Sequence, residues 1–385
     1  MGARPRALEK LVSVGAKTLL LAGGGRWARV YLSILAELDA PLEQVLIASQ
    51  HGGEALKTAI GKANARGLRR FTRVTDWRGA KADAAIVINA ARDHAGTACG
   101  LLEQGLPVLV EKPVALTLAE AGTLVTEAGR RRLSLRSALM LNHCVYLRNF
   151  AEAVRDTLGP PAGIAVMWKD PPAEARYGET KSFDFGIGLA EDVGPHIASL
   201  LAAVAGPASL ESADIERGGL SARLRGVCGG AALTVEMARE APARQRWIRI
   251  RDGRGGEAML DFSPEPGTIT INGVPRDADP EWRQRLSPLT LQLLDFLRLE
   301  QRARDLDEIL STTAFATAAA GLTRAAQRRW LVAAPGSAGD RLVAARELLA
   351  PGLIAAGLAA PGDNNALEAA AQRALAGDPA LAPYL

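Results

Sequence analysis

The chain has 385 residues, of which 48% are hydrophobic and 23% are charged, and this balance predicts a globular protein of two domains. The net charge is +4 with charges of both signs interspersed, and aromatic residues make up only 4%, so a nucleic-acid-binding surface is not expected. No apolar run reaches the roughly 18–20 residues that span a bilayer, and the N-terminus lacks the apolar core of a signal peptide. Three scattered cysteines fit a reducing compartment and predict neither disulfides nor a metal site: Cys99, Cys144 and Cys228. We therefore expect a cytoplasmic protein.

After an N-terminal extension (1–16), the run Thr18–Ala22 predicts a buried strand that leads directly into a glycine-rich turn. A helical pattern follows from Arg29 to Leu38. A strand, a Gly-x-Gly-x-x-Ala turn and a helix in this order are typical of a dinucleotide-binding site. The glycines permit the turn and the close approach of a pyrophosphate, which the helix N-terminus attracts. The candidate cofactor residues in this turn are Gly23, Gly25, Arg26, Trp27 and Ala28.

The second predicted strand, Leu46–Ala48, ends at Ser49-Gln50-His51. An acidic residue that binds the ribose of NAD is expected about 20 residues beyond such a turn. Ser49 stands in its place, and a serine hydroxyl tolerates the 2′-phosphate that a carboxylate repels. The sequence therefore favours NADP(H) over NAD(H), with Ser49, Gln50 and His51 as candidate contacts; His51 is equally readable as an ordinary loop residue.

The remaining first domain alternates predicted strands with helices, which favours a doubly wound parallel sheet over residues 17–141. Asn89 follows the fourth strand and His94 begins the next helix, and both are candidate cofactor residues; packing under the loop is an equal alternative for His94. The predicted strands are Phe71–Val74, Ala84–Ile88, 107–110 and Leu135–Met140, and the predicted helices are His94–Gln104 and Leu118–Arg130.

Glu111-Lys112-Pro113 ends the strand 107–110. The carboxyl edge of an open α/β sheet is where ligands bind, and a lysine there can polarise a carbonyl or pass a proton. Alone, such a tripeptide is more often a surface turn. The preceding glycine turn makes Lys112 a candidate catalytic residue and Glu111 a candidate cofactor contact.

Residues 142–329 have the pattern of an α+β domain with a large, open and mostly antiparallel sheet. Asp192 and His196 are four residues apart, so they share one face if this segment is helical, and the carboxylate can then orient an imidazole proton donor. The helix is predicted to begin at Ile197. The cationic segment around Trp168, Arg176, Tyr177 and Lys181 either covers the pocket or is a solvated loop. Residues 330–385 predict a helical tail broken at its Pro-Gly pairs.

Three motifs in this order resemble the Gfo/Idh/MocA family, named for glucose–fructose oxidoreductase and inositol dehydrogenase. They are the glycine turn 23–28, Glu111-Lys112-Pro113, and Asp192-x-Gly194-x-His196. The resemblance covers roughly residues 17–325. It implies a Rossmann domain that binds NAD(P), a second domain whose open sheet builds homodimers or homotetramers, and a substrate pocket lined by Lys112, Asp192 and His196. Tyr31 replaces the histidine common after the glycine turn.

The expected activity is hydride transfer between the nicotinamide and a carbonyl or alcohol carbon of a small polar substrate, with Lys112 and His196 in acid–base roles. Reduction of an imine, as in thiazoline-reducing relatives, is one alternative, for which the Tyr31 departure leaves room. A sensor that binds NAD(P) without turnover and a glycosidase that uses NAD as a transient oxidant are others. We expect a small-molecule substrate and neither nucleic acid nor a membrane as partner.

Overall fold

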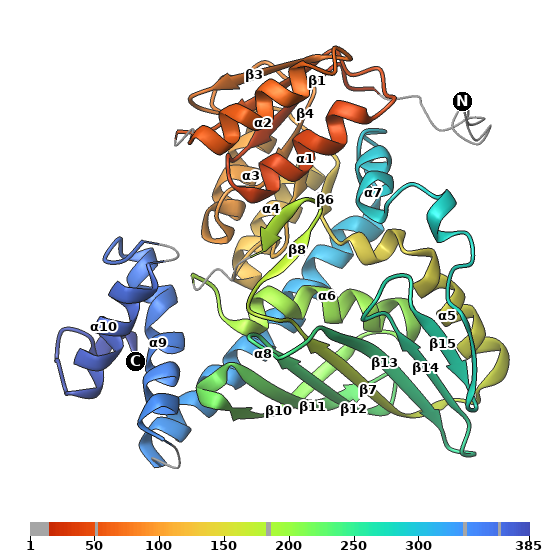
Figure 1. The fold of residues 1–385 in the computed structure, drawn as a ribbon, viewed down its shortest axis with the longest axis vertical. Helices are drawn as coiled ribbons and strands as arrows, with labels where there is room; N and C mark the ends of the chain where they lie inside the picture. The colour runs from red at the N-terminus through yellow and green to blue at the C-terminus, as the bar shows by residue number, and fades with distance from the viewer. Residues whose placement is uncertain (1–14, 51–52, 182–185, 334–336, 361–362) are drawn as a thin grey trace. The chain divides into compact units, whose positions relative to one another are not determined.

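The computed structural model describes residues 15–50, 53–181, 186–333, 337–360 and 363–385. They form two compact units (Figure 1). The first contains the described residues up to His143 together with Ala175–Glu179 and Leu286–Leu310. The second contains Cys144–Glu174, the described residues from 180 to Arg285, and those from Ser311 onward. Each unit therefore draws on segments that are far apart in the sequence.

The first unit is built on a six-stranded parallel sheet with the strand order β3-β2-β1-β4-β5-β6. The chain order reverses between β1 and β4, and open sheets bind ligands at the carboxyl edge beside such a reversal. All residues of β4 and β5 are buried, because a parallel sheet covered on both faces needs apolar strands. The strands are β1 (Thr18–Ala22), β2 (Gln44–Ala48), β3 (Arg70–Val74), β4 (Ala84–Val87), β5 (Val108–Val110) and β6 (Leu135–Ser137).

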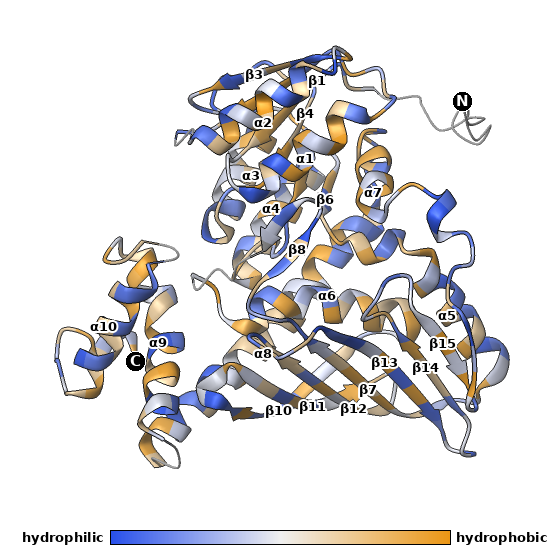
Figure 2. Cartoon of the chain, in the orientation of Figure 1, coloured by the Kyte–Doolittle hydropathy of each residue, from blue (hydrophilic) through white to orange (hydrophobic). Residues whose placement is uncertain are grey.

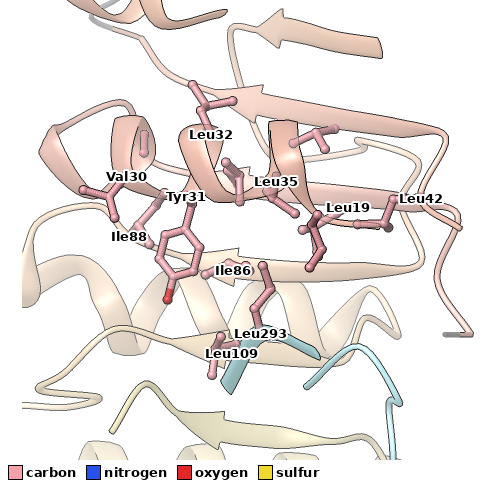
Figure 3. Close-up of a cluster of buried hydrophobic side chains, with 14 of the residues drawn as sticks. Leu19, Val30, Tyr31, Leu32, Leu35, Leu42, Ile86, Ile88, Leu109 and Leu293 are labelled. Carbon is pink, nitrogen blue, oxygen red and sulfur yellow. The ribbon is translucent and has the colours of Figure 1, made fainter. Parts of the chain in front are cut away.

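Helices cover both faces of this sheet, which confirms the predicted doubly wound α/β fold. One core lies between the sheet and α1, α2 and α7 (Figure 3), and a second lies between the sheet and α3 and α4. In α1, Ala28, Leu32 and Leu35 recur at helical spacing and are buried. The helices are α1 (Arg26–Glu37), α2 (Glu54–Asn64), α3 (His94–Glu103), α4 (Leu118–Arg131) and α7 (Pro288–Phe296), with short 3₁₀ turns at Ala91–Asp93 and Met140–His143.

The second unit contains an eight-stranded sheet with the order β10-β11-β12-β7-β13-β14-β15-β16. Neighbouring strands are antiparallel except β12 and β7, which confirms the predicted mostly antiparallel sheet. Buried residues alternate with partly or fully exposed ones along the central strands, and the strands of this sheet carry both hydrophobic and hydrophilic residues (Figure 2). The strands are β7 (Pro161–Lys169), β10 (Ala208–Glu216), β11 (Ser221–Cys228), β12 (Ala231–Ala238), β13 (Gln245–Asp252), β14 (Glu257–Asp261), β15 (Thr268–Ile271) and β16 (Val274–Asp277).

Helices α5 (Val145–Thr157) and α6 (Leu189–Val204) belong to the second unit, and the long helix α8 (Ala303–Ala333) runs from the first unit into the second. The tail forms α9 (Ala338–Ala355) and α10 (Asn364–Leu375), which pack on one another around their own apolar core. A small two-stranded sheet, β8 (Glu174–Arg176) and β9 (Glu179–Lys181), completes the chain.

Several predicted boundaries were wrong. α1 begins three residues before Arg29, α6 begins eight residues before Ile197, and β6 ends at Ser137. Helix α2 was not predicted, because only Leu56 and Ala63 of its residues are buried and the apolar pattern is weak. Pro351-Gly352 does not break the tail, because α9 continues through both residues. The other two predicted breaks, at Pro335-Gly336 and Pro361-Gly362, lie outside the described residues.

Candidate active site

The glycine turn after β1 contains two glycines that the fold requires and one that it does not. Gly23 has φ +140°, and a Cβ there would lie 2.6 Å from the carbonyl carbon of Ile88. A Cβ on Gly24 would lie 2.2 Å from Oγ of Ser49. A Cβ on Gly25 would meet nothing within 4 Å. The fold itself therefore does not require a glycine at position 25. The absence of a side chain there leaves open space where α1 begins.

Helix α1 begins at this open space without a capping side chain. Gly25 is the N-cap residue, and as a glycine it offers no side chain that could accept hydrogen bonds from the amides of the first turn. The first backbone amides of the helix consequently point outward without side-chain acceptors, which is the arrangement that binds the phosphates of a dinucleotide. Arg26 stacks over the Trp27 ring at 5.1 Å, and burial lowers its pKa. Its buried Nε atom has no hydrogen-bond partner.

A groove of about 1160 Å³ lies along the carboxyl edge of the sheet in the first unit. The glycine turn, the ends of β1, β2 and β4, the segment Thr75–Arg78 and one face of α3 line it. Its position at the reversal of strand order and the open space at Gly25 fit a dinucleotide with its pyrophosphate at the start of α1. Of the candidates from the sequence, the groove is lined by Gly23, Gly25, Arg26, Trp27, Ser49, Gln50 and Asn89; Ala28 is buried in the core below.

The end of β2 carries no carboxylate at its described positions. Ser49 is buried under Gly24, whereas Gln50 is exposed at the groove. His51 lies outside the described residues. Arg73 on the neighbouring strand β3 donates hydrogen bonds to the carbonyl oxygens of Ser49, at 3.0 Å, and Gln50, at 3.3 Å. The sequence analysis missed Arg73, because its place beside β2 follows only from the pairing of the two strands.

Two further groove residues also escaped the sequence analysis. Trp77 and Arg78 line the groove after β3, and the Arg78 guanidinium lies 4.4 Å from the centre of the Trp77 ring. Gly100 of α3 lies against the Trp77 ring, since a Cβ there would approach it to 2.5 Å. The only signal for Trp77 and Arg78 in the sequence was their position directly after the third strand.

His94 joins two segments that were predicted to bind the cofactor. It is buried, and its Nδ1 lies 2.8 Å from the Pro113 carbonyl oxygen while Nε2 lies 3.2 Å from that of Asn89. Burial lowers the pKa of His94. The Asn89 side chain donates to Oγ1 of Thr97, and its buried Oδ1 has no hydrogen-bond partner. A direct contact of His94 with a cofactor stays a prediction.

Glu111 and Lys112 leave β5 at the same edge of the sheet. Glu111 is buried and accepts a hydrogen bond of 3.1 Å from the hydroxyl of Tyr31, which in turn accepts one from the amide of Gln292. Burial raises the pKa of Glu111 to about 7, although Lys112 and Tyr31 act in the opposite direction. Lys112 is partly exposed, and its peptide bond to Pro113 is cis.

Asp192 and His196 lie in the second unit, on helix α6, and both side chains are partly exposed. The His196 ring stacks on the buried Trp168 ring, with centroids 5.1 Å apart and an angle of 9° between the planes. Arg246 lies 4.2 Å from the same indole and forms a buried ion pair with Asp170 at 2.7 Å. The buried Trp168 ring therefore supports the His196 imidazole and fixes the plane of that imidazole.

The glycine between Asp192 and His196 has a packing role. A Cβ on Gly194 would lie 3.0 Å from the Cα of Ala316 on α8. The glycine thus lets the two helices approach closely. Together with Pro195 inside the helix, it concealed the beginning of α6 from sequence analysis.

The segment Ala175–Glu179 belongs to the first unit and contacts α1. Glu179 forms an ion pair with Arg29 at 2.6 Å, and Arg26 donates to the Arg176 carbonyl oxygen at 3.3 Å. The rings of Tyr177 and Trp27 are 6.3 Å apart. Arg176 and Tyr177 belong to the segment that was expected either to cover the pocket or to be a solvated loop, and they lie at the start of the helix below the glycine turn.

The structure brings the candidate residues together in two groups. The glycine turn, Asn89, His94, Glu111 and Lys112 belong to the first unit, and Asp192 and His196 belong to the second. Within the described ranges, no group of three or more His, Cys, Asp or Glu side chains is arranged to hold a metal ion. Among the same residues, no helix combines the length and apolar character needed to cross a bilayer.

Comparisons with known proteins agree with the Rossmann fold of the first unit. Residues 17–138 match the Gfo/Idh/MocA family model, described as an oxidoreductase family with an NAD-binding Rossmann fold. No curated protein sequence matches the chain. Solved structures with the same fold include the 3-ketoreductase KijD10 of Actinomadura kijaniata in complex with TDP-benzene and NADP. It has a TM-score of 0.63 and 16% identity over 78% of this chain and 96% of that one.

Two further neighbours have similar scores. UDP-N-acetylglucosamine 3-dehydrogenase GnnA of Acidithiobacillus ferrooxidans has a TM-score of 0.60 and 18% identity, covering 80% of this chain and 98% of its own. An oxidoreductase of Agrobacterium radiobacter in complex with NAD+, L-tartaric acid and magnesium has a TM-score of 0.59 and 14% identity, covering 80% and 96%. At these identities the likeness shows the fold.

The groove and the family match define the class: this protein is an NAD(P)-dependent oxidoreductase. The family match over residues 17–138 includes the glycine turn and Glu111-Lys112-Pro113 and agrees with the resemblance drawn from these motifs.

Proposed function

We propose that the protein transfers a hydride reversibly between NADP(H) and a carbonyl or alcohol carbon of a small, sugar-like substrate. In the reductive direction the cofactor supplies the hydride to the carbonyl carbon, and the oxygen takes up a proton to give an alcohol. The observation that carries this proposal is the place of Lys112 at the end of β5, on the same sheet edge as the glycine turn.

Four side chains of this chain have roles in the proposed reaction. Lys112 stabilises the negative charge that develops on the oxygen, and His196 exchanges the proton with it. Asp192, one helical turn before His196, orients the imidazole, while Trp168 holds its plane by stacking at 5.1 Å. General acid–base assistance of this kind contributes roughly 100- to 10,000-fold in rate.

The substrate class is supported by two of the structural neighbours. One is described as a 3-ketoreductase and the other as a UDP-N-acetylglucosamine 3-dehydrogenase, so both interconvert an alcohol and a ketone. We propose that this chain acts on the same functional group of a polyhydroxylated molecule. A panel of ketosugars and sugar alcohols, with oxidation or reduction of the cofactor as readout, tests this proposal.

Substitution of the two acid–base residues tests the mechanism. Lys112→Ala and His196→Ala should each lower kcat by about 100-fold or more, while the Kd for NADPH stays within a few-fold of the wild-type value. Lys62→Ala, which removes an exposed lysine of α2, is the matched control and should leave kcat unchanged. Wild-type turnover in both site variants would refute the assignment.

We propose NADP(H) as the preferred cofactor. The support is the absence of a carboxylate at Ser49 and Gln50 and the guanidinium of Arg73, which is held against both of their carbonyl oxygens. An arginine near the end of β2 accommodates a 2′-phosphate, which a carboxylate would repel. Kd for NADPH should be at least about 10-fold below that for NADH. Arg73→Gln should raise the Kd for NADPH and leave the Kd for NADH almost unchanged. Equal Kd values for NADPH and NADH in the wild-type protein would contradict the preference.

Imine reduction is the second candidate, because Tyr31 stands where the family commonly has a histidine and its hydroxyl is engaged by Glu111. Turnover of cyclic imines without turnover of ketosugars would favour this activity. Saturable quenching of NADPH fluorescence with no turnover of any substrate would instead favour a sensor.

We also propose self-association through the open face of the eight-stranded sheet, as a homodimer or homotetramer. Met167 and Trp247 are paired on β7 and β13, and both side chains are partly exposed. Their neighbours on these strands, Val166, Trp168 and Ile248, are buried on the opposite face. Ala165 and Met259 lie on the same face as this apolar pair, and such a face is suited to a second copy of the chain.

A further inference from the structure

The tail helix α9 packs on the rest of the second unit through a close backbone contact at Gly218. The 3₁₀ turn η3 (Arg217–Gly219) precedes β11, and its residues Gly218 and Gly219 have φ of +66° and +104°. A Cβ on Gly218 would lie 2.4 Å from the Asp340 carbonyl oxygen and 2.7 Å from the amide of Ala344. A side chain at Gly218 would therefore push α9 away, so the turn is shaped to receive the helix.

A buried ion pair continues this contact. Arg239 follows β12 and is 1% exposed, and its Nη1 lies 3.6 Å from Oε2 of Glu347 on α9, which is also buried. Burial of a guanidinium and a carboxylate is costly unless they are paired, and removal of one partner leaves an uncompensated charge. The tail thus supplies a carboxylate partner of a buried arginine in the body of the domain, and the other oxygen of this carboxylate accepts a hydrogen bond from Arg346 of α9 at 3.5 Å.

The same arginine holds the chain just before α6. Nη2 of Arg239 donates a 3.1 Å hydrogen bond to the carbonyl oxygen of Ile187, two residues before α6 begins. The first turn of α6 is also tied to α8, where Arg324 forms an ion pair with the buried Glu191. These contacts fix the start of the helix that carries Asp192 and His196.

We propose that the C-terminal tail is a positioning element for the active site. Glu347 of α9 orients Arg239, Arg239 holds the Ile187 carbonyl, and α6 then presents Asp192 and His196 in a fixed direction. Glu347 and Arg239 are positioning residues, because they act through the backbone of Ile187 and touch neither substrate nor cofactor. The expected effect on kcat rests on the proposed function, whereas the expected effect on the start of α6 does not.

Paired substitutions separate positioning from stability. Glu347→Leu removes this carboxylate from beside the buried Arg239, so both the melting temperature and kcat should fall, the latter by about 10-fold or more, since small misplacements of reacting groups are costly. Arg239→Met combined with Glu347→Leu removes both charges, and such replacements commonly restore stability. We expect this double variant to regain the wild-type melting temperature while kcat remains low, because the bond to Ile187 is absent.

The control lies in the same tail. Arg373 and Asp378 form an exposed ion pair, and Arg373→Gln should change neither melting temperature nor kcat, as expected for a surface pair. Affinity for NADPH should be unchanged in all three variants. Recovery of wild-type kcat in the double variant would overturn the proposal, because the tail would then contribute stability alone.

Hydrogen–deuterium exchange gives a readout that does not depend on turnover. In Glu347→Leu and in the double variant, amides at the start of α6, from Leu189 to Val193, should exchange faster than in the wild-type protein. Amides of β13 and β14 should be unchanged. Unaltered exchange at α6 would refute the positioning role, whereas wild-type protein without any turnover would refute only the proposed function.

Discussion

At the scale of single residues, the most unusual group in the first unit is Glu111. Its carboxyl is buried with the Tyr31 hydroxyl as a hydrogen-bond donor, and Gln292 of α7 completes a polar chain of three side chains. Each member comes from a different element. The chain therefore ties α1, the end of β5 and α7 together directly beside Lys112.

Glu111→Gln should change how stability depends on pH. Burial raises the pKa of Glu111 from 4.5 to about 7, so the folded state binds this proton more tightly than the unfolded state. The resulting stabilisation is complete below pH 4.5 and is lost as the pH rises through 7. Between pH 5 and pH 8, the free energy of unfolding of the wild-type protein should fall by roughly 2–3 kcal/mol relative to that of Glu111→Gln, as measured by urea unfolding.

Glu127→Gln is the control for this measurement. Its partly exposed carboxyl is paired with Arg130 and Arg131, which lower its pKa to about 2. Glu127 is therefore ionised in both states between pH 5 and pH 8, and its substitution should shift stability by an amount that does not vary with pH. If the difference in free energy of unfolding between the wild type and Glu111→Gln also does not vary with pH, the raised pKa of Glu111 is contradicted.

The residues that the sequence could predict are those whose setting is local. Gly23, Gly25 and Lys112 follow directly from a strand and the turn after it. Gln292 and Arg73 could not be found in this way, because Gln292 is 261 residues from Tyr31 in the chain and Arg73 reaches Ser49 only through strand pairing. Trp168 was misread as a residue that could cover the pocket, although it is buried beneath His196.

At the scale of elements, the glycine turn allows a sharp comparison. Gly25→Ala should leave the unfolding free energy within about 0.5 kcal/mol of wild type, because its Cβ would enter open space. It should weaken dinucleotide binding by about 10-fold or more, because the backbone must approach the pyrophosphate there. Calorimetric titration with NADPH measures the effect, and full affinity in this variant would argue against the proposed pose.

Gly23→Ala should act in the opposite manner. Its φ of +140° and the 2.6 Å approach to Ile88 make any side chain strained, so stability should fall by about 3 kcal/mol or more. The two variants distinguish a glycine needed by the fold from a glycine needed by the ligand. An equal loss of stability in both would show that this distinction is wrong.

Helix packing at the D-x-G-x-H segment gives another prediction at this scale. Gly194→Ala should destabilise the protein by roughly 1–3 kcal/mol, because the new Cβ would press on the backbone of α8 at Ala316. Gly122→Ala in α4 is the matched control. Its Cβ would meet nothing within 4 Å, and the helix should gain about 0.5–1 kcal/mol. Thermal unfolding compares the two, and stabilisation by both substitutions would contradict the close packing of α6 on α8.

Elements were predictable where apolar runs or helical spacing stood out, as in the strands of the first unit. The start of α6 was not, because Gly194 and Pro195 are poor helix formers whose cost is offset by packing against α8. The continuation of α9 through Pro351 has the same cause. Leu349, Leu353 and Ile354 bury their side chains in the core of the tail, which outweighs the lost backbone hydrogen bond.

At the scale of the whole molecule, neither unit is continuous in sequence. The first takes Ala175–Glu179 and Leu286–Leu310 from parts of the chain that otherwise build the second. Helix α7 covers the Rossmann sheet, and Leu293 joins the core that β1 and α1 form (Figure 3). A sequence pattern does not show such exchanges, because the amphipathic pattern of α7 does not specify which sheet it covers.

The proposed association of two or more copies belongs to this scale. Trp247→Glu should convert the oligomer to monomer, because it places a charge at the centre of the apolar pair on the open sheet face. Leu68→Glu alters an exposed leucine on the first unit and should leave the assembly unchanged. Sedimentation velocity distinguishes the outcomes. A wild-type monomer, or an oligomer that survives Trp247→Glu, would exclude this face.

The central claim is that this chain transfers a hydride directly between a nicotinamide and a substrate carbon with the help of Lys112 and His196. The most direct test uses NADPH carrying deuterium at the transferred position of C4, with products from the ketosugar panel analysed by mass spectrometry. We predict deuterium bound to the carbinol carbon of the product with the wild-type enzyme, and a loss of that product in Lys112→Ala and His196→Ala. Product without deuterium on carbon, or undiminished labelling in both variants, would contradict the account.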